Sequence, residues 1–249
     1  MVDVPALILA GGLGTRLEGV VTGIPKVLAP VRGRPFLSYL LHQVQAAGVR
    51  EVVLCTGYRA DQVFKTFGTR HEELSLRYSS ESRPLGTAGA IRQAIGLVEA
   101  ERLLVLNGDS YIHNPLEEFH RWHLARESSF PGSLLLTWTE NSARFGTVEL
   151  GPRAAIRSFH EKRGLSQAGW INGGVYLLRR SLLESIPPNR VISLENQVFP
   201  DWIRFGLGGY TTRARFIDIG TPESYAEAGS VMAEIAAGCR NTEICLRPR

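Results

Sequence analysis

The sequence predicts a single α/β domain in which a mostly parallel sheet lies between layers of helices. Three observations lead to this prediction. Short apolar runs rich in Val, Leu and Ile alternate with helical patterns along the first half of the chain. These runs show little polar alternation, which is typical of strands covered on both faces. The chain has 249 residues, of which 44% are hydrophobic, and this is enough to build one large core.

Four strands are predicted in the first half, at residues 5–10, 51–56, 74–79 and 102–107. A helix is expected over 36–48, where apolar residues recur at helical spacing and Gly48 stands at the end. A second helix starts near Thr87. The Asn-Pro-Leu-Glu sequence at 114–117 is typical of an N-cap, a first-turn Pro and a capping-box Glu, and opens a helix to about Arg126. This alternation predicts right-handed crossovers in a Rossmann-like sheet.

The second half has a different pattern. Strands without intervening helices are predicted at residues 133–139, 145–150, 154–161 and 170–178. They indicate a mixed sheet with antiparallel pieces, in three layers overall. Two helices follow, over 194–204 and 221–237, the second with Thr221 as N-cap and Gly238 at its end. No linker-like or low-complexity stretch and no internal repeat divides the chain, so residues 1–249 are expected to form one domain.

Composition excludes several classes of protein. No apolar run reaches the ~18 residues of a membrane span, and the apolar N-terminus runs directly into glycines, so neither a membrane segment nor a signal peptide is expected. The net charge of +4 comes without any Lys/Arg run, which favours small phosphorylated substrates over nucleic acid. Of three sparse cysteines, Cys55 is predicted to be a buried strand thiol, and the set suits a reducing, cytoplasmic location. His120, His123 and His160 are interpreted as surface or helix-face residues.

A glycine-rich loop follows the first predicted strand. Its sequence is Gly-Gly-Leu-Gly-Thr-Arg over residues 11–16, and Lys26 follows a proline. Glycines let the backbone approach phosphate oxygens, and the two basic side chains add positive charge. A dinucleotide fingerprint would need Gly in place of Leu17, and a P-loop would need Ser or Thr after Lys26, where Val27 stands. A tight strand-to-helix turn with surface basic residues is the alternative.

With this loop, the sequence resembles the sugar-1-phosphate nucleotidylyltransferases. The likeness spans about residues 4–230 and includes PLGTAGAI (84–91), VLNGDSY (105–111), RFGTVEL (144–150), FHEK (159–162), INGGVYLL (171–178) and FIDIGTPESY (216–225), in that order. The blocks are most similar to the branch that transfers a guanylyl group to a heptose 1-phosphate. The resemblance implies a GT-A-like fold, with a nucleotide-binding half over about residues 1–130 and a sugar-binding half over about 131–235.

Two acidic residues are candidates for a Mg²⁺ site. Asp109 follows the strand predicted over 102–107, and Asp218 lies in a further predicted strand that begins at Phe216 and runs into a turn at Gly220. Ligands of open α/β sheets bind at the carboxyl ends of strands. Mg²⁺ is held by one or two carboxylates and completes its shell with phosphates and water. A cap or turn role is the alternative for either residue alone. A glycosyltransferase of similar architecture would usually show Asp-x-Asp, whereas Asp109 is followed by Ser110 and Tyr111.

The resemblance also implies roles for single residues. Arg16 and the amides of residues 12–16 would hold the departing pyrophosphate, Lys26 would neutralise charge near the α-phosphate, and Lys162 would orient the attacking sugar phosphate. The nucleotide-binding residues would be Leu9, Gly11, Gly12, Gly14, Thr15, Glu81, Gly86 and Thr87. The sugar-binding residues would be Gly146, Glu161, Asn172 and Gly173. An exposed charged turn is the alternative for residues 161–162. Glycines in the middle of a strand weaken a sheet unless another group approaches closely, and a sugar is the candidate for that group.

Glu81 bears on the choice of nucleotide base. In the thymidylyl- and uridylyl-transferring relatives, a Gln five residues before the glycine of this block faces the pyrimidine, and Glu81 stands at that offset from Gly86. A carboxylate only accepts hydrogen bonds. The Watson–Crick edge of guanine offers two adjacent donors, whereas uracil and thymine offer one donor between two acceptors. The sequence therefore favours GTP, with a solvated loop Glu as the alternative.

The function expected from the resemblance is transfer of a guanylyl group from GTP to a sugar 1-phosphate, with Mg²⁺ as cofactor and a GDP-sugar and pyrophosphate as products. Three alternatives stay open. One is a mannose-1-phosphate guanylyltransferase, although those relatives usually carry an extra C-terminal domain and only residues 235–249 follow the last helix core here. Another is a hexose-1-phosphate uridylyl- or thymidylyltransferase. The third is a regulatory nucleotide-sugar-binding protein without turnover. Ile244 and Leu246 hint at a homodimer contact.

Overall fold

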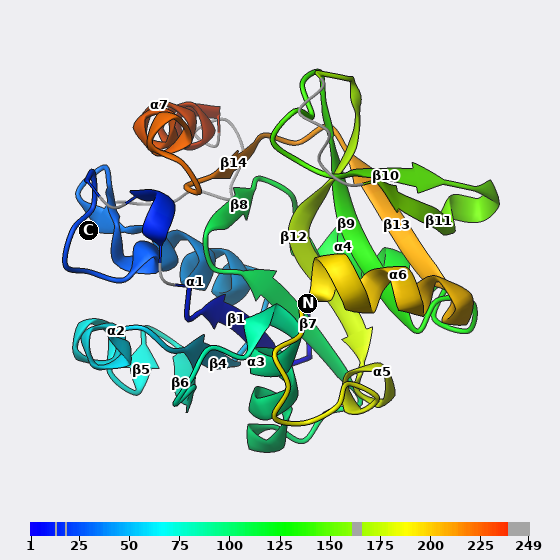
Figure 1. Cartoon of the computed structure of the whole chain (residues 1–249), viewed down its shortest axis with the longest axis horizontal. Helices are drawn as coiled ribbons and strands as arrows, with labels where there is room; N and C mark the ends of the chain where they lie inside the picture. Colours follow the sequence, from blue (N-terminus) through cyan, green and yellow to red (C-terminus); the bar gives the residue numbers. More distant parts are fainter. Residues whose placement is uncertain (13, 18, 161–165, 239–249) are drawn as a thin grey trace.

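The computed structural model describes residues 1–12, 14–17, 19–160 and 166–238. A ten-stranded mixed sheet crosses the molecule (Figure 1). Along one path its strands are β11 (Ile156–His160), β10 (Thr147–Leu150), β12 (Gly169–Arg179), β7 (Arg102–Asn107), β1 (Ala6–Ala10), β4 (Glu51–Thr56), β6 (Leu74–Ser80) and β5 (Arg70–His71). β9 (Gly132–Thr139) branches from β12 and pairs with β13 (Leu207–Thr212). Two small sheets join β8 (Ser110–Ile112) to β14 (Phe216–Asp218), and β2 (Pro30–Val31) to β3 (Arg34–Pro35).

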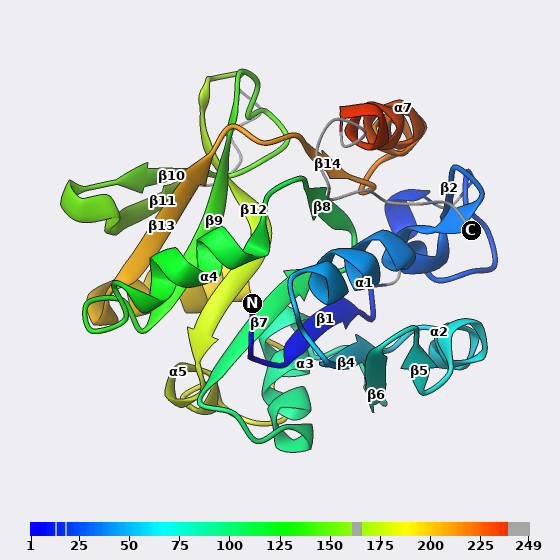
Figure 2. The ribbon, with the colours of Figure 1, turned by 180° about the vertical axis from the view of Figure 1, so that it is seen from behind.

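Helices cover both faces of the sheet. They are α1 (Phe36–Ala46), α2 (Ala60–Phe67), α3 (Gly86–Ala94), α4 (Leu116–Leu124), α5 (Arg180–Glu184), α6 (Phe199–Trp202) and α7 (Pro222–Gly238). Short 3₁₀ turns lie at Thr15–Leu17, Lys26–Leu28, Ile95–Leu97, Pro152–Ala154 and Ile203–Phe205, and a π-helical turn lies at Leu194–Val198. In Figure 1 the face with α3, α5 and α6 is turned to the viewer, and Figure 2 shows α1 and α4 on the opposite face.

Neighbouring residues of one strand show why both faces are apolar. In β1, Ile8 belongs to the buried cluster that contains α1, whereas Leu7 belongs to the cluster that contains α3. Both side chains are fully buried. Successive side chains of a strand point to opposite faces, so a strand between two layers of helices has no polar side. The predicted three-layer, mostly parallel mixed sheet is confirmed.

The two halves of the sheet differ as predicted. β4, β1 and β7 are parallel neighbours, as are β4 and β6, and each is reached through a crossover. β12 then runs antiparallel to β7 and β9, and β10 is antiparallel to both β11 and β12. The strands predicted for the second half therefore form antiparallel pairs with one another, and β9 also pairs in parallel with β13, which was not predicted from the sequence. Helix α2 was absent from the sequence-based expectations.

Three predicted helix features have different outcomes. The capping box at residues 114–117 is wrong: α4 begins at Leu116, and the Asn114 side chain donates to the Pro115 carbonyl (3.0 Å) instead of accepting from the helix. Thr221 does cap α7, because its hydroxyl accepts from the Ser224 amide (3.3 Å). The helix predicted over 194–204 is broken into π, α and 3₁₀ turns, near Pro200, which has no amide hydrogen to donate.

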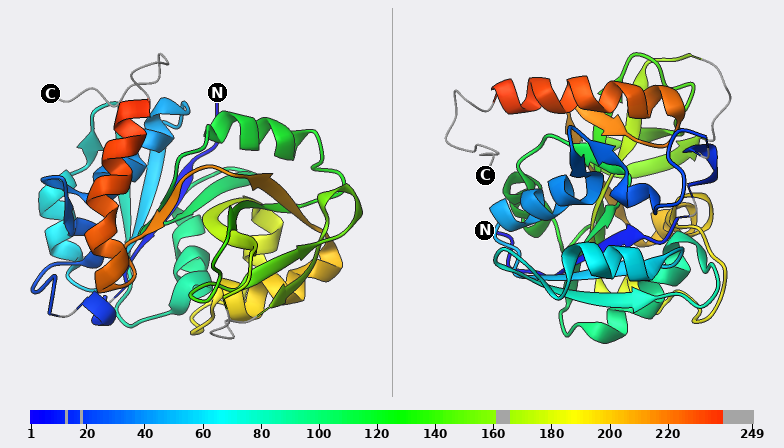
Figure 3. Two further views of the ribbon diagram at one scale, coloured as in Figure 1. Left: turned by 90° about the horizontal axis from the view of Figure 1, so that it is seen from above. Right: turned by 90° about the vertical axis from the view of Figure 1, so that its left-hand side faces the viewer.

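Helix α7 closes one end of the molecule. Figure 3 shows it lying across the hairpin formed by β2 and β3. The Tyr225 hydroxyl donates to the Pro30 carbonyl (2.7 Å), which joins α7 to that hairpin. Helix α7 follows β14 after only three residues, so this packing also fixes the position of Asp218 at the end of β14. No helix in the described part of the chain is long and apolar enough to cross a membrane.

Two histidines of α4, His120 and His123, lie on its buried face, which agrees with the helix-face interpretation and not with the surface one. His123 is fully buried and shares a hydrogen bond with the Ser133 hydroxyl (2.8 Å), and His120 is 5% exposed. Burial lowers the pKa of His123 to about 4. An imidazole that stays neutral inside the folded chain titrates near 6.5 once the chain unfolds.

We expect His123 to make the fold acid-sensitive. Above pH ~6.5 the imidazole is neutral in both states, and as the pH falls toward 4 only the unfolded chain takes up the proton. The stability lost over this window is about 3 kcal/mol. His123→Gln should flatten the pH dependence of the free energy of unfolding between pH 6.5 and 4, measured by urea denaturation. His160→Gln, at an exposed position, is the control; equal slopes in the wild type and His123→Gln would contradict the expectation.

Candidate active site

A cavity of about 920 Å³ opens beside the carboxyl ends of β1 and β7 and continues toward β10 and β12. Twelve of the residues predicted from sequence line it: Leu9, Gly11, Gly12, Arg16, Lys26, Glu81, Gly86, Thr87, Asp109, Gly146, Asn172 and Asp218. They come from all parts of the chain between the first strand and the last helix. The structure therefore brings the candidate nucleotide, sugar and metal residues into one cleft.

Two predicted glycines do not line this cleft. Gly14 lies in a smaller adjoining cavity of about 240 Å³. A Cβ on Gly173 would lie 2.9 Å from the Leu135 carbonyl oxygen, so a side chain at this position would collide with the neighbouring strand β9. Thr15 lies in the 3₁₀ turn Thr15–Leu17. Glu161, Lys162, Cys239, Ile244, Cys245 and Leu246 lie outside the described residues.

The glycine-rich loop folds over Lys26. The Leu17 amide donates to the Gly14 carbonyl (2.8 Å), which closes the turn after β1. Gly14 has φ +67°, and a Cβ there would lie 3.2 Å from the Lys26 Cβ. A larger residue would therefore be strained both by the positive φ and by the close contact with Lys26. Arg16, in the same turn, is exposed and lines the cleft. The loop thus places both Lys26 and Arg16 in the lining of the cavity.

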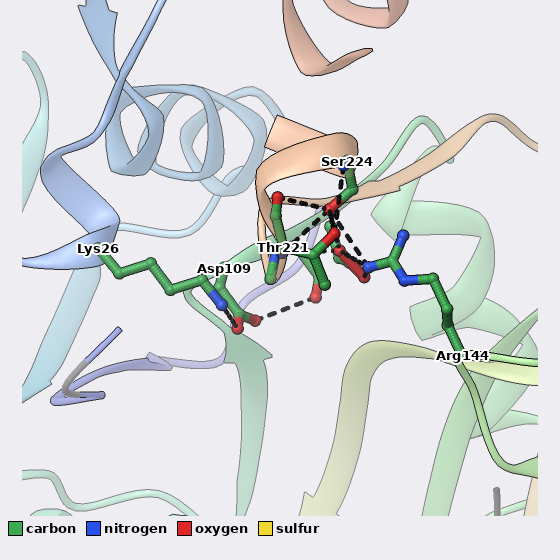
Figure 4. Close-up of polar contacts among 8 residues, drawn as sticks. Lys26, Asp109, Arg144, Thr221 and Ser224 are labelled. Atoms are coloured by element: carbon green, nitrogen blue, oxygen red, sulfur yellow. Dashed lines mark hydrogen bonds and ion pairs between the residues drawn. The ribbon is translucent and has the colours of Figure 1, made fainter. Parts of the chain in front are cut away.

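Lys26 and Asp109 form an ion pair inside the cleft. Lys26 Nζ lies 2.5 Å from Asp109 Oδ2, and the two side chains are 13% and 40% exposed (Figure 4). Asp109 lies between β7 and β8, where the chain leaves the parallel part of the sheet. A Cβ on Gly220 would lie 3.6 Å from Lys26 Nζ, which places the ammonium group near the turn that follows Asp218.

Asp218 is held by four hydrogen bonds. Its Oδ1 accepts from the Gly220 amide (3.0 Å) and from the Ser224 hydroxyl (2.9 Å). Arg144 Nη2 donates to Oδ1 (2.7 Å) and to Oδ2 (2.8 Å), as Figure 4 shows. Burial disfavours the charged carboxylate, but these hydrogen bonds and the Arg144 charge outweigh burial and lower the pKa of Asp218 below its ordinary value. The side chain is therefore a rigid, ionised acceptor.

The pairing of β8 with β14 brings the two candidate metal ligands together. Asp218 is opposite Ser110 in this antiparallel pair, and the Ile219 amide donates to the Asp109 carbonyl (2.9 Å). Residues 109 apart in sequence thus meet at one edge of the cleft. The Ser110 hydroxyl donates to Asp109 Oδ1 (3.1 Å), which helps to fix that carboxylate.

This donor set fits Mg²⁺ bound together with phosphates. Two carboxylates face the cleft from adjacent strands, and the described chain contains no group of three or more His, Cys, Asp or Glu side chains that could hold a metal by themselves. A site with two protein carboxylates leaves the other positions of an octahedral Mg²⁺ to water and to substrate phosphate oxygens. Zinc-type chemistry would need more nitrogen or sulfur ligands than these residues offer.

Glu81 lines the cleft from the position directly after β6. Its Oε2 accepts a long hydrogen bond from the Leu85 amide (3.4 Å), and it lies 3.4 Å from where a Cβ on Gly57 would be. Burial raises the pKa of Glu81, and the Leu85 amide offsets this only in part. Burial, with a smaller contribution from the Glu81 charge, also raises the pKa of the Cys55 thiol. A desolvated carboxylate with one weak donor is suited to accept hydrogen bonds from a ligand.

The segment 192–195 packs against the start of α3. Thr87 Oγ1 donates to Glu195 Oε2 (2.9 Å) and accepts from the Leu194 amide (2.7 Å). Gly86 has φ +71°, and a Cβ there would lie 2.5 Å from the Ile192 carbonyl oxygen. Only glycine fits that approach, so the Gly86 block forms a wall of the cleft together with a segment about a hundred residues further along the chain.

Asn172 sits at a β-bulge of β12. Its Oδ1 accepts from the Gly174 amide (2.9 Å), and its Nδ2 donates to the Tyr176 hydroxyl (2.8 Å). These two bonds fix the amide group, which leaves the second Nδ2 hydrogen for a ligand. Gly146 faces the same part of the cleft from the β9–β10 loop, and a Cβ there would lie 2.9 Å from the His160 carbonyl oxygen.

Sequence reasoning missed several cleft residues. Arg144, Glu195, Asn107, Ser193 and Asn196 line the cavity, and none of them had been given a role. Arg144 is the first residue of the RFGTVEL block, so its position in that block was a usable signal. Asn107 lies in the VLNGDSY block and so carried the same kind of signal, whereas Ser193, Glu195 and Asn196 lie in no such block. These four residues reach the cleft only through the packing of 192–199 against α3 and of β12 against β7.

Fold and cleft together define a nucleotide-transferring enzyme. A family model described as "Nucleotidyl transferase" matches residues 5–234, and the chain belongs to this family. Among curated proteins, the chain is 34% identical to D-glycero-alpha-D-manno-heptose 1-phosphate guanylyltransferase of Aneurinibacillus thermoaerophilus, over 90% of this chain and 96% of that protein. It is 33% identical to the protein of the same name from Campylobacter jejuni, over 88% of this chain and 96% of that protein.

Solved structures agree with this assignment. HddC from Yersinia pseudotuberculosis complexed with GMP-PN is 31% identical, with a TM-score of 0.80 over 92% of this chain and 99% of that chain. A glucose-1-phosphate thymidylyltransferase assigned as putative in Bacillus anthracis has a TM-score of 0.81 at 20% identity, over 92% and 95% of the two chains, and shows the shared fold alone.

Proposed function

We propose that this chain transfers the guanylyl group of GTP to a sugar 1-phosphate, first of all D-glycero-α-D-manno-heptose 1-phosphate, and releases a GDP-sugar and pyrophosphate. Glu81 is the observation that carries the choice of GTP: it is a partly desolvated carboxylate in the cleft with one weak hydrogen-bond donor. The N1–H and 2-amino groups of guanine would supply the missing donors. The names of the relatives from A. thermoaerophilus and C. jejuni support both the guanylyl group and the heptose.

In this proposal the cleft works by positioning and charge neutralisation. An oxygen of the sugar phosphate attacks the α-phosphorus of GTP in line with the departing pyrophosphate, and the protein needs no covalent nucleophile. Lys26 neutralises charge near the α-phosphate, and Arg16 holds the pyrophosphate. Asp109 and Asp218 would hold Mg²⁺, which would supply positive charge to offset the charge of the substrate phosphates. Lys162 orients the sugar phosphate.

The two halves of the chain divide the substrates. Residues up to about 130 bind the nucleotide, which is supported by the presence of the glycine loop, Glu81 and the Gly86 block in the lining of the cleft. Residues from about 131 to 235 bind the sugar, with Asn172 as a fixed amide and Gly146 as a second residue in the lining of the cleft. A cytoplasmic location supplies both GTP and Mg²⁺.

A mannose-1-phosphate guanylyltransferase is the second candidate. The enzyme of that name from Mycobacterium tuberculosis is 31% identical over 92% of this chain and 64% of its own length. Glu81 would recognise guanine in both candidate functions, which differ only in the sugar that is bound. One hydroxymethyl group changes the binding free energy by only ~1–3 kcal/mol. A regulatory protein without turnover is disfavoured, because Arg16, Lys26 and both aspartates line the cleft.

The test is a matrix of nucleoside triphosphates against sugar 1-phosphates, with pyrophosphate release as the readout. GTP with heptose 1-phosphate should give the highest kcat/KM, and mannose 1-phosphate with GTP should rank next. A matrix in which UTP or dTTP leads would overturn the guanylyl assignment. A matrix without pyrophosphate release in any combination would overturn the enzymatic assignment.

Removal of the Arg16 charge is expected to slow catalysis more than it weakens binding. Pyrophosphate gains negative charge as it departs, so a donor aimed at it stabilises the transition state more than the ground state. Arg16→Ala should lower kcat by ~10²-fold or more, as for loss of one preorganised donor. Arg59→Ala, at an arginine that does not line the cleft, is the control in the same steady-state assay. A raised KM for GTP with unchanged kcat would show that Arg16 only helps binding.

A further inference from the structure

Arg144 is carried to the cleft by a loop that is packed against β14. The loop spans residues 140–146 between β9 and β10, and the Phe145 amide donates to the Ser142 carbonyl (2.7 Å). The Phe145 ring meets the Phe216 ring edge to face, with centroids 5.7 Å apart. Phe216 begins the strand that ends at Asp218. The arginine is therefore held beside that aspartate by apolar packing that does not depend on their charges.

One nitrogen of the guanidinium makes the contact. Nη2 donates to both Asp218 oxygens and to the Ser224 hydroxyl (3.2 Å), as Figure 4 shows. These are the hydrogen bonds that Arg144 makes to described residues, and all three use Nη2. The side chain is 44% exposed and lines the cleft. The remaining N–H groups of the fork are thus available at the cavity surface.

The two carboxylate oxygens of Asp218 accept different numbers of hydrogen bonds. Oδ1 also accepts from the Gly220 amide and the Ser224 hydroxyl, whereas Arg144 is the one described residue that donates to Oδ2. A divalent cation that approaches Oδ2 meets the Arg144 nitrogen at 2.8 Å from that oxygen. Two cations cannot share this position without strong repulsion. Asp109 is in the same situation with Lys26.

From this arrangement we infer that Arg144 is an internal counter-ion of Asp218 that a divalent cation displaces, and that the released guanidinium then binds phosphate in the cleft. Arg144 is a positioning residue while it holds Asp218 and a ligand-binding residue once released. The inference rests on the proposed function for the identity of the phosphate substrate. It does not depend on which base or sugar the substrates carry.

This exchange couples the two binding events. Phosphate stabilises the released position of Arg144, so it favours the state in which Asp218 is open to the cation. By reciprocity, the cation favours phosphate binding to the same degree. In the absence of ligands, Arg144 keeps the carboxylate oriented and neutralised, which a buried charge requires. Asp218 is thereby oriented for cation binding before any cation is present.

The first test measures exposure of single arginines by modification with phenylglyoxal and peptide mass spectrometry, in the full chain without nucleotide. Modification of Arg144 should become severalfold faster when Mg²⁺ is added and should slow again when inorganic phosphate follows. Arg215 is the internal control, because it is 67% exposed, pairs with Glu234 and lies on the same segment as Asp218. Modification of Arg144 that is unaffected or slowed by Mg²⁺ would overturn the exchange, and lack of protection by phosphate would overturn the second step.

The second test measures Mn²⁺ binding by electron paramagnetic resonance, again without GTP. Arg144→Gln removes the competitor and should tighten Mn²⁺ binding about fivefold or more, the lower end of typical coupling between sites. Arg215→Gln removes an equal charge nearby and should change the affinity less than twofold, and Arg144→Lys should stay near the wild type if the charge itself is the competitor. Equal effects of Arg144→Gln and Arg215→Gln would refute the inference. Because neither test contains GTP, failure of the guanylyl assignment in the substrate matrix would leave them unaffected.

Discussion

Asp109→Asn and Asp218→Asn should each abolish Mg²⁺-dependent turnover while the fold stays intact. Each substitution removes one of two carboxylate charges that the β8–β14 pair brings to the same edge of the cleft. An amide is a poorer ligand for a hard cation than a carboxylate is. Each substitution therefore leaves the site with a single protein carboxylate. Asparagine still accepts hydrogen bonds, so the Gly220 amide keeps its partner in Asp218→Asn.

Steady-state kcat at saturating Mg²⁺, together with circular dichroism of each variant, measures this outcome. Asp61→Asn is the matched control, because Asp61 pairs with Lys65 on the surface of α2 and does not line the cleft. The control should retain wild-type kcat. If Asp109→Asn or Asp218→Asn kept a kcat near that of the wild type, the metal role of that residue would be wrong.

Glu81 should set the preference for GTP over UTP and dTTP at ~10–100-fold or more in kcat/KM. Guanine presents two donors to the carboxylate. A pyrimidine carbonyl that faces the carboxylate would leave the oxygens of both groups repelled and partly unpaired, which costs ~1–3 kcal/mol of binding free energy. Glu81→Gln should erode the ratio mainly by weakening GTP, because the amide keeps one acceptor and turns a donor toward the donors of guanine.

The same substitution should not destabilise the empty protein. Burial raises the pKa of Glu81, so above that pKa the ionised carboxylate disfavours the folded state, and the stability it removes returns only as the pH falls. Glu81→Gln removes this unfavourable contribution, and its melting temperature at pH 7–8 should equal or exceed that of the wild type. If Glu81→Gln lowered both the activity with GTP and the melting temperature, Glu81 would have a structural role.

Steady-state kinetics with GTP, UTP and dTTP, together with thermal melts, should be measured for the wild type and for Glu81→Gln to test this role of Glu81. Glu73→Gln, at an exposed carboxylate that pairs with Arg50 and does not line the cleft, is the control for loss of a charge. A wild type that prefers dTTP or UTP would contradict the guanine assignment. GTP kinetics that Glu81→Gln leaves unchanged would contradict the role of Glu81.

Local sequence determined the elements that are buried on both faces. The strands over residues 51–56 and 102–107 begin and end where the apolar runs do, because a strand covered by helices must be apolar throughout. Short polar elements were less predictable. The expected cap at Asn114 failed because its side chain bonds to the adjacent Pro115 carbonyl, a local competition that the sequence motif does not distinguish from capping.

What the sequence alone determined about this protein is the class of its fold and twelve of the residues that line its cleft. Glycines, basic residues and aspartates at strand ends are chemically distinctive, so Gly11, Lys26, Asp109 and Asp218 were found without coordinates. Tertiary structure alone decided which side chains meet. The Lys26–Asp109 and Arg144–Asp218 pairs join residues more than seventy positions apart, and such contacts depend on strand pairing and loop packing, which local patterns do not encode.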